Sequence, residues 1–453
     1  MGFWRFFKKY HVEILLFGAA FSVRILFLIA IMYRIPVPFI GSDSQSYIDT
    51  AKGFLATGHF INADGAPNSY EMPAYPLFLA FFIRFFADLK IVSVVQGVLA
   101  GISTVLLYRI SLFITKPIAL TGALLFAFDP AGIFYSNFIV TEPLFIFFIL
   151  AFLFFLITRR DALLSGACVP GVLLGIATMI RPVGEILLPA VLVFYLVGKS
   201  FSLRRAGVFL SIFVIGWLAV VGPWMIRNKI LFGGAELSAV ASWQLYHSHA
   251  PHFYAYKNGI AERDAERLFQ ERLEIVDPYK EEVRRGNVGS LRHAPYMWQV
   301  GLDYIRQYPF QFGFFHIAKT APFFISDGLR QIARDIKLHA VPSANLGSLA
   351  LRGNAKGLFN ALIKDPTTLM LFSVGFLFWL GINIMMVIGS VALLRSPNSA
   401  LRALTLFLLL AILLTALVAG GAVAHPRYRY SVSPFMFILA AVGLSQIRMR
   451  RRG

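Results

Sequence analysis

Long apolar runs constrain the fold of this sequence more than any other feature. About ten of them can cross a hydrocarbon core roughly 30 Å thick. They fall near residues 12–33, 92–114, 117–136, 138–157, 162–180, 183–198, 207–226, 370–394, 402–421 and 432–447. Only 14% of the residues are charged, whereas a soluble protein has about 25%. The sequence therefore predicts an all-α integral membrane protein with about ten transmembrane helices.

Basic residues lie in short clusters between the apolar runs and give a formal net charge of +19. This spacing follows the positive-inside rule and argues against a nucleic-acid partner, which would need one continuous basic face. With the N-terminus in the cytoplasm, the clusters all fall on the cytoplasmic side. We therefore predict a multi-pass membrane protein, and the compactness of the chain favours the plasma (inner) membrane over the endoplasmic reticulum. The clusters contain Arg5, Lys8, Lys9, Lys116, Arg159, Arg160, Lys199, Arg204, Arg205, Arg395, Arg402, Arg448, Arg450, Arg451 and Arg452.

One further apolar segment, residues 73–87, is shorter and is interrupted by Arg84. If it crossed the membrane, the basic clusters near 159–160 and 199–205 would lie outside. We therefore expect an interfacial or re-entrant helix on the outer side. The chain then divides into an N-terminal transmembrane catalytic module at 1–227 with a first outer loop at 34–91, an outer loop domain at 228–369, and C-terminal transmembrane helices at 370–453.

Several motifs lie in or beside the predicted outer loops. They read GSDSQSYIDTAKGFLATGHF from Gly41, SYEMPAYPLFLAFFIRFF from Ser69, FDPAGIFYSNFIVTEPLF from Phe128, MIRPVG from Met179 and HPRYRYSVSP from His425. In this order they resemble the membrane glycosyltransferases of the protein O-mannosyltransferase and aminoarabinose transferase type. The resemblance covers most of the chain except 228–369. It implies the C-type glycosyltransferase fold and a sugar transferred from a polyprenyl-phosphate carrier on the outer face. Independently of the resemblance, the amphipathic charged stretch from Glu262 indicates a small outer domain within 228–369.

The resemblance also implies that Asp43 is the general base. An acceptor hydroxyl is a poor nucleophile, and a carboxylate can take its proton while the anomeric carbon is attacked. A single displacement of this kind inverts the anomeric centre. The alternative is that Asp43 caps the helix that follows it. Many relatives carry two adjacent acids where this chain has Asp43 and Ser44, so we do not predict two cooperating carboxylates. Asp49 is expected to face solvent.

Three more carboxylates are candidates. Glu142 is a second catalytic candidate, and its alternative role is a first-turn acid that complements a helix dipole. Glu71 and Asp129 are candidate substrate-binding residues. The alternatives are a loop-facing carboxylate for Glu71 and a turn former for Asp129.

Arginines suit a lipid phosphate because the guanidinium fork matches its oxygens and stays charged. Arg181, Arg427 and Arg429 are candidates to bind substrate, together with Tyr428 between the last two. Their alternative is an interfacial position with the charged end in water. Arg24 lies within the first apolar run, where it either holds an acid in place or contacts the carrier phosphate.

No cofactor is implied with certainty, and a divalent metal ion stays an open prediction. His247, His249 and His252 form an HSHAPH cluster, but their spacing alone favours packing over metal binding. The expected partners are a polyprenyl-phosphate-sugar donor, membrane lipid, and an acceptor that is a glycolipid, a polysaccharide or a protein. The alternative function is a polytopic transporter or lipid flippase, which should place polar groups near the midplane in two related halves. Beyond Arg24 and Glu185 few such groups occur.

Overall fold

The computed structural model describes residues 2–33, 35, 41, 43–86, 88–159, 162, 164–198, 202–285, 289–338, 356–357, 360 and 366–450. Over these residues every regular element is a helix, and an isolated bridge joins Ile61 and Pro67. The predicted all-α class is confirmed.

Each predicted apolar run coincides with an apolar helix. These helices are α1 (Gly2–Met32), α4 (Lys90–Ser111), α5 (Lys116–Ala127), α7 (Glu142–Thr158), α8 (Val169–Ile180), α9 (Leu188–Val197), α10 (Leu203–Phe232), α20 (Pro366–Leu394), α21 (Ser399–Val418) and α23 (Ser433–Arg450). By length and composition, five can cross a membrane, namely α1, α4, α10, α20 and α21. The protein is thus a multi-pass membrane protein, and the count of ten spans stays a prediction.

Prolines explain why several helices are shorter than the apolar runs that contain them. A residue before proline avoids the helical conformation, and Asp129, Arg181 and His425 are all extended before Pro130, Pro182 and Pro426. Three short elements follow these breaks: α6 (Pro130–Tyr135), the 3-10 helix η2 (Pro182–Leu187) and α22 (Pro426–Tyr430). Two of the breaks therefore fall at the candidate residues Asp129 and Arg181, and the third lies two residues before the candidate Arg427.

The packing of α20 against α23 shows how the bundle is held together. A Cβ atom added to Gly389 would lie 2.0 Å from the Leu439 carbonyl oxygen, and one added to Gly443 would lie 2.0 Å from the Met385 carbonyl oxygen. Only glycine allows the two backbones to come this close. Without a hydrophobic driving force between helices in lipid, such contacts are what membrane helices use to associate.

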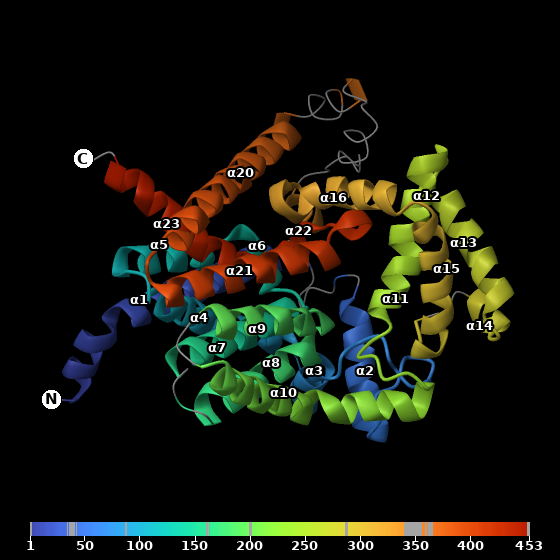
Figure 1. Cartoon of the computed structure of the whole chain (residues 1–453), viewed down its shortest axis with the longest axis horizontal. Coiled ribbons are helices and arrows are strands. Elements are labelled where there is room, and N and C mark those ends of the chain that lie inside the picture. Colours follow the sequence, from blue (N-terminus) through green and yellow to red (C-terminus); the bar gives the residue numbers. More distant parts are fainter. Residues whose placement is uncertain are drawn as a thin grey trace.

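Five helices form a separate small core, which we call the cap (residues 240–307). They are α11 (Val240–Gln244), α12 (Ala250–Asn258), α13 (Glu262–Val276), α14 (Lys280–Arg284) and α15 (Ala294–Gln307). The charged stretch from Glu262 forms α13, which buries Ala265, Phe269 and Leu273 on one face. The cap lies at one end of the molecule, and the two chain ends lie at the other (Figure 1). The predicted domain division stays a prediction, and α10 continues past its boundary at 227.

Two further helices precede α4 along the chain, and two more follow the cap. They are α2 (Ser44–Thr57), α3 (Ala74–Phe85), α16 (Pro309–Ile325) and α17 (Leu329–Asp335). The predicted interfacial segment at 73–87 forms α3, which packs against α2 and α8.

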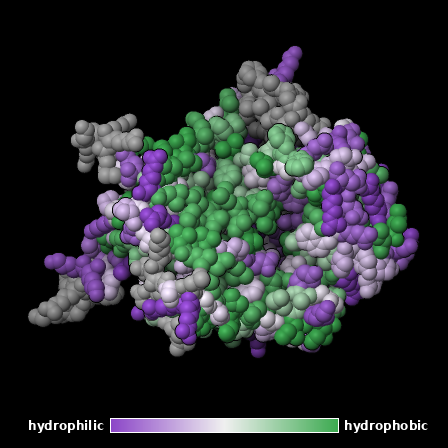
Figure 2. Space-filling model, viewed as in Figure 1, coloured by the Kyte–Doolittle hydropathy of each residue, from purple (hydrophilic) through white to green (hydrophobic). Residues whose placement is uncertain are grey.

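The surface divides into polar and apolar zones. Figure 2 shows an apolar band across the middle of the visible face, between the polar cap and polar groups near the chain ends. Exposed apolar side chains of α20 and α21 include Val374, Leu377, Val387, Leu413 and Leu417. Such a continuous apolar surface is what acyl chains solvate.

Candidate functional site

A cavity of about 810 Å³ lies where α2, η2, the beginning of the cap and α22 meet. Of the predicted site residues, Asp43, Glu71, Arg181, Arg427 and Tyr428 line it. They come from sequence positions almost 400 residues apart, so the fold brings together motifs that the sequence shows only as separate stretches. Asp129, Arg24 and Arg429 do not line this cavity.

Glu142 anchors two arginines behind the cavity wall. Its side chain is 0% exposed. Its Oε1 atom accepts hydrogen bonds from Arg181 Nη1 at 2.5 Å and from Arg427 Nε at 2.6 Å, and its Oε2 atom accepts one from Arg427 Nη2 at 3.3 Å. A buried carboxylate with paired arginine donors is strongly held. Both of its oxygens are occupied, which suits a positioning role better than proton transfer.

Arg427 also reaches the candidate base. Its Nη1 atom donates to Asp43 Oδ2 at 2.7 Å, and the Asp43 side chain remains 50% exposed. Asp43 stands at the N-cap position of α2, but its carboxylate makes no capping hydrogen bond. The Asp43 carboxylate is therefore exposed to the cavity and lies next to a fixed cation. An acceptor in the cavity can approach this carboxylate.

Arg181 is held by the same carboxylate as Arg427. Its extended position before Pro182 turns it out of α8, and Nη1 donates to Thr141 Oγ1 at 2.7 Å as well as to Glu142. Its guanidinium carbon lies 5.9 Å from the ring centroid of Tyr428. The two arginines thus share one buried negative charge and present cationic surface to the cavity.

Glu71 ties the two halves of the first loop together. It accepts hydrogen bonds from Ser46 Oγ on α2 and from Asn68 Nδ2. Both partners are neutral, and no described cation pairs with the Glu71 carboxylate, which lines the cavity. It remains a candidate to contact substrate.

His425 is a site residue that the sequence reasoning missed. It caps α22, because its Nδ1 atom accepts from the Arg427 backbone N–H at 3.2 Å. Burial, together with the positive charge of Arg427, lowers the pKa of His425 to about 4. The imidazole is therefore neutral at pH 7. The signal was its place directly before a proline and beside an arginine.

Tyr47 and Tyr70 were also missed, although both line the cavity. Tyr47 lies one helical turn after Asp43, so it shares a face of α2 with the candidate base. Burial raises the pKa of Tyr47, Tyr70 and Tyr428, so their phenols stay neutral hydrogen-bonding groups. The i, i+4 spacing from Asp43 could have identified Tyr47.

The other three predicted residues are engaged on the far side of α22. Asp129 caps α6 by accepting from the Ala131 and Gly132 N–H groups, each at 3.3 Å, which agrees with the turn-forming alternative. Arg24 donates to the carbonyl oxygens of Ala20 and Ala127. Their binding of substrate stays a prediction, and these contacts favour structural roles.

Arg429 is also held by backbone oxygen atoms. It donates to the carbonyl oxygens of Phe323, Phe324 and Ser326 at 2.9 to 3.1 Å, and it stacks 3.6 Å from the Trp379 ring centroid. Arg427 and Arg429 are two positions apart on a helix, so they point to opposite sides. The structure thus separates two residues that the sequence analysis grouped.

The described part of the chain contains no group of three or more His, Cys, Asp or Glu side chains placed to hold a metal ion. The three candidate histidines have different neighbours. His247 stacks on Trp243, His249 lies beside His316, and His252 contacts Glu266 at 3.2 Å. The prediction of a divalent ion remains untested.

Comparison with known families agrees with the motifs. Residues 71–226 match the family model described as dolichyl-phosphate-mannose-protein mannosyltransferase. The matched part contains Glu71, Asp129, Glu142 and Arg181 and leaves residues 1–70 and 227–453 outside it. A search of curated proteins found no match. The predicted resemblance is confirmed for the matched part.

Proposed function

We propose that this chain, in which residues 71–226 match the dolichyl-phosphate-mannose-protein mannosyltransferase family, is a membrane glycosyltransferase. It moves a sugar from a polyprenyl-phosphate carrier to an acceptor hydroxyl beside Asp43. The observation that carries the proposal is the Asp43–Arg427–Glu142–Arg181 cluster at one cavity. It combines an exposed carboxylate with two fixed guanidinium groups, which are the parts that such a transfer needs.

Each part of the cluster has a chemical role in the proposal. Asp43 takes the proton of the acceptor hydroxyl as its oxygen attacks the anomeric carbon. The bond from that carbon to the phosphate oxygen breaks, and the electron pair leaves with the polyprenyl phosphate. Arg181 and Arg427 stabilise the negative charge that grows on this phosphate.

Glu142 acts as a positioning residue in this scheme. It fixes both guanidinium groups before substrate arrives, so little reorganisation is needed during the reaction. One base and no enzyme nucleophile give a single displacement, so the product has the inverted anomeric configuration.

The donor, acceptor and side of the membrane belong to the proposal. The cavity lies beside the cap, and the positive-inside rule puts the cap on the periplasmic or extracellular side. The acceptor is a glycolipid, a polysaccharide or a protein. The cap, which lies outside the matched residues, supplies part of the cavity wall through Trp243 and Ala294, so acceptor choice is expected to depend on it.

The test is transfer in nanodiscs from a panel of polyprenyl-phosphate sugars by wild type, Asp43→Asn and Asp49→Asn. Asp49 lies on the same helix, accepts from Gln45 at 2.7 Å and does not line the cavity. We expect the Asp43 variant to lose on the order of 10²-fold or more in kcat and the Asp49 variant to retain activity. An inverted product by NMR would agree with the single displacement.

Two results would contradict this proposal in different ways. Wild type that turns over no donor of the panel would count against the transferase. Full activity in a folded Asp43→Asn protein would leave the transferase intact and move the base to Glu71.

A further inference from the structure

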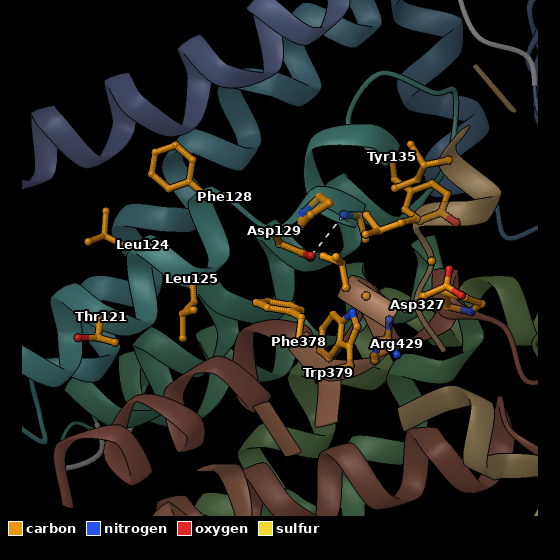
Figure 3. Close-up of a pocket in the computed structure, with 18 of the residues that line it drawn as sticks. Thr121, Leu124, Leu125, Phe128, Asp129, Tyr135, Asp327, Phe378, Trp379 and Arg429 are labelled. Carbon is orange, nitrogen blue, oxygen red and sulfur yellow. Dashed lines mark hydrogen bonds between the residues drawn. The ribbon is translucent and has the colours of Figure 1, made fainter. Parts of the chain in front are cut away.

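A second hollow lies on the other side of α22. It encloses about 500 Å³ between α5, α17 and α20. Figure 3 shows Leu124, Leu125 and Phe128 along one side and Phe378 and Trp379 along the other. We call this hollow the α5–α20 groove. Its lining is mostly apolar.

The groove opens where acyl chains are expected. Its walls include partly exposed side chains on two apolar helices, with Leu124 39% exposed on α5 and Val374 57% exposed on α20. Water in such a hollow would find few polar partners, and apolar cavities exclude it. Hydrocarbon from the surrounding bilayer fits the lining better.

Three of the four charged groups at the groove have partners within the protein, and the exposed Arg448 is the one without a described partner. Arg429 is held by three carbonyl oxygens, Asp327 accepts from Arg330 Nε at 2.7 Å, and Asp129 caps α6. Asp129, Asp327 and Arg429 therefore leave little binding capacity for a lipid phosphate, and Arg448 is the groove residue that a phospholipid headgroup could contact.

The groove and the catalytic cavity share no lining residue, because α22 stands between them. Pro426 and Arg429 face the groove, whereas Arg427 and Tyr428 line the cavity. A lipid whose chain fills the groove would therefore not place its phosphate at Arg427 without passing around this helix. The separation favours an ordinary bilayer lipid over the sugar donor.

We propose that the α5–α20 groove binds one acyl chain of a bilayer phospholipid as a structural site. The chain packs against the Trp379–Arg429 pair and so supports α22, the helix that carries Arg427 on its other face. This site is independent of the reaction in the catalytic cavity. It makes the stability of α22 depend on bound lipid.

The test uses two matched pairs of tryptophan variants. Val374→Trp fills the groove, and Val387→Trp places the same ring on the same helix at a residue that is equally exposed, 58%, and does not line it. Leu124→Trp and Leu120→Trp form the second pair, on α5, with 39% and 41% exposure. If one variant of the first pair fails to fold, the second pair still tests the proposal.

Native mass spectrometry of detergent-washed protein counts the retained lipids and gives their masses. We expect wild type, Val387→Trp and Leu120→Trp to retain one phospholipid more than Val374→Trp and Leu124→Trp. Added phospholipid should raise the thermal unfolding midpoint only in the first group. Equal retention in all variants, no retained lipid in wild type, or a retained polyprenyl phosphate lost from the groove-filled variants would overturn the proposal. None of these readouts depends on sugar transfer.

Discussion

At the scale of single residues, Glu142 is the group on which the candidate site depends most. It is fully buried and binds two arginines, and one of them also binds Asp43. Removing one member of such a buried network leaves the remaining charges uncompensated, which is more costly than the net contribution of the network. The position of two cations therefore rests on one carboxylate.

Glu142→Gln should lower both stability and turnover. Loss of the shared negative charge is expected to cost about 3 kcal/mol or more of unfolding free energy, and misplaced arginines should lower kcat on the order of 10²-fold. Thermal unfolding and steady-state transfer in nanodiscs measure the two effects. Glu185→Gln is the control, because Glu185 lines the same cavity on an exposed position without a described ion pair. Equal behaviour of the two variants would contradict the anchoring role.

The residue scale is also where sequence reasoning was least complete. It proposed Asp43, Arg181, Arg427 and Glu142 as candidates, but it could not show that Glu142 and Arg427, 285 positions apart, are in contact. The sequence around each residue gives no information about this contact, because the contact arises from the packing of the bundle. Sequence reasoning also named Arg427 and Arg429 together without considering that side chains two positions apart point to different sides of a helix, and the structure places them at different cavities.

At the scale of elements, α22 links the catalytic cavity to the rest of the molecule. Arg429 fastens it to the end of α16, and His425 caps its first turn. A helix of one turn has little stability of its own. Its conformation must therefore come from these side-chain contacts.

Lowering the pH should weaken one of these contacts. The pKa of His425 is about 4 in the folded protein and about 6.5 in an unfolded chain. As the pH falls below 6.5 the unfolded chain takes up the proton first, so stability is full above pH 6.5 and is lost as the pH falls toward 4.

His425→Asn keeps a side-chain oxygen for the cap and removes the titration. Its thermal unfolding midpoint should fall less between pH 7 and pH 4.5 than that of wild type. Some decline will remain, because burial beside His316 also lowers the pKa of His249 to about 4. His59→Asn, at an exposed histidine, is the control and should follow wild type. A pH profile of His425→Asn identical to wild type would refute the assignment.

Arg429→Lys tests the other attachment of α22. A lysine keeps the charge but lacks the planar fork that reaches three carbonyl oxygens. Loss of two of these bonds and of the stacking on Trp379 should cost about 2 kcal/mol or more. Arg395→Lys, at an exposed arginine near the end of α20, should change stability by less than about 0.5 kcal/mol. If the two variants lose the same unfolding free energy relative to wild type, Arg429 does not fasten α22.

At the scale of the whole molecule, the apolar runs predicted where the helices lie, because hydrocarbon selects continuous apolar segments. They did not predict helix ends, since the prolines at 130, 182 and 426 break the chain inside or beside apolar sequence. The cap was recognised from the amphipathic stretch that forms α13. The contacts of the cap with the cavity were not predicted, because they involve residues that share no sequence motif.

The spacing of the two arginines in α22 has a consequence for reading related sequences. Each residue turns a helix by about 100°, so a separation of two positions sends the side chains into different compartments. A separation of three or four would direct both into one compartment. In a related chain with one residue inserted between these arginines, both arginines would still be present, but they would no longer point into different cavities. A sequence alignment that allows a gap at this position would still score both arginines as conserved.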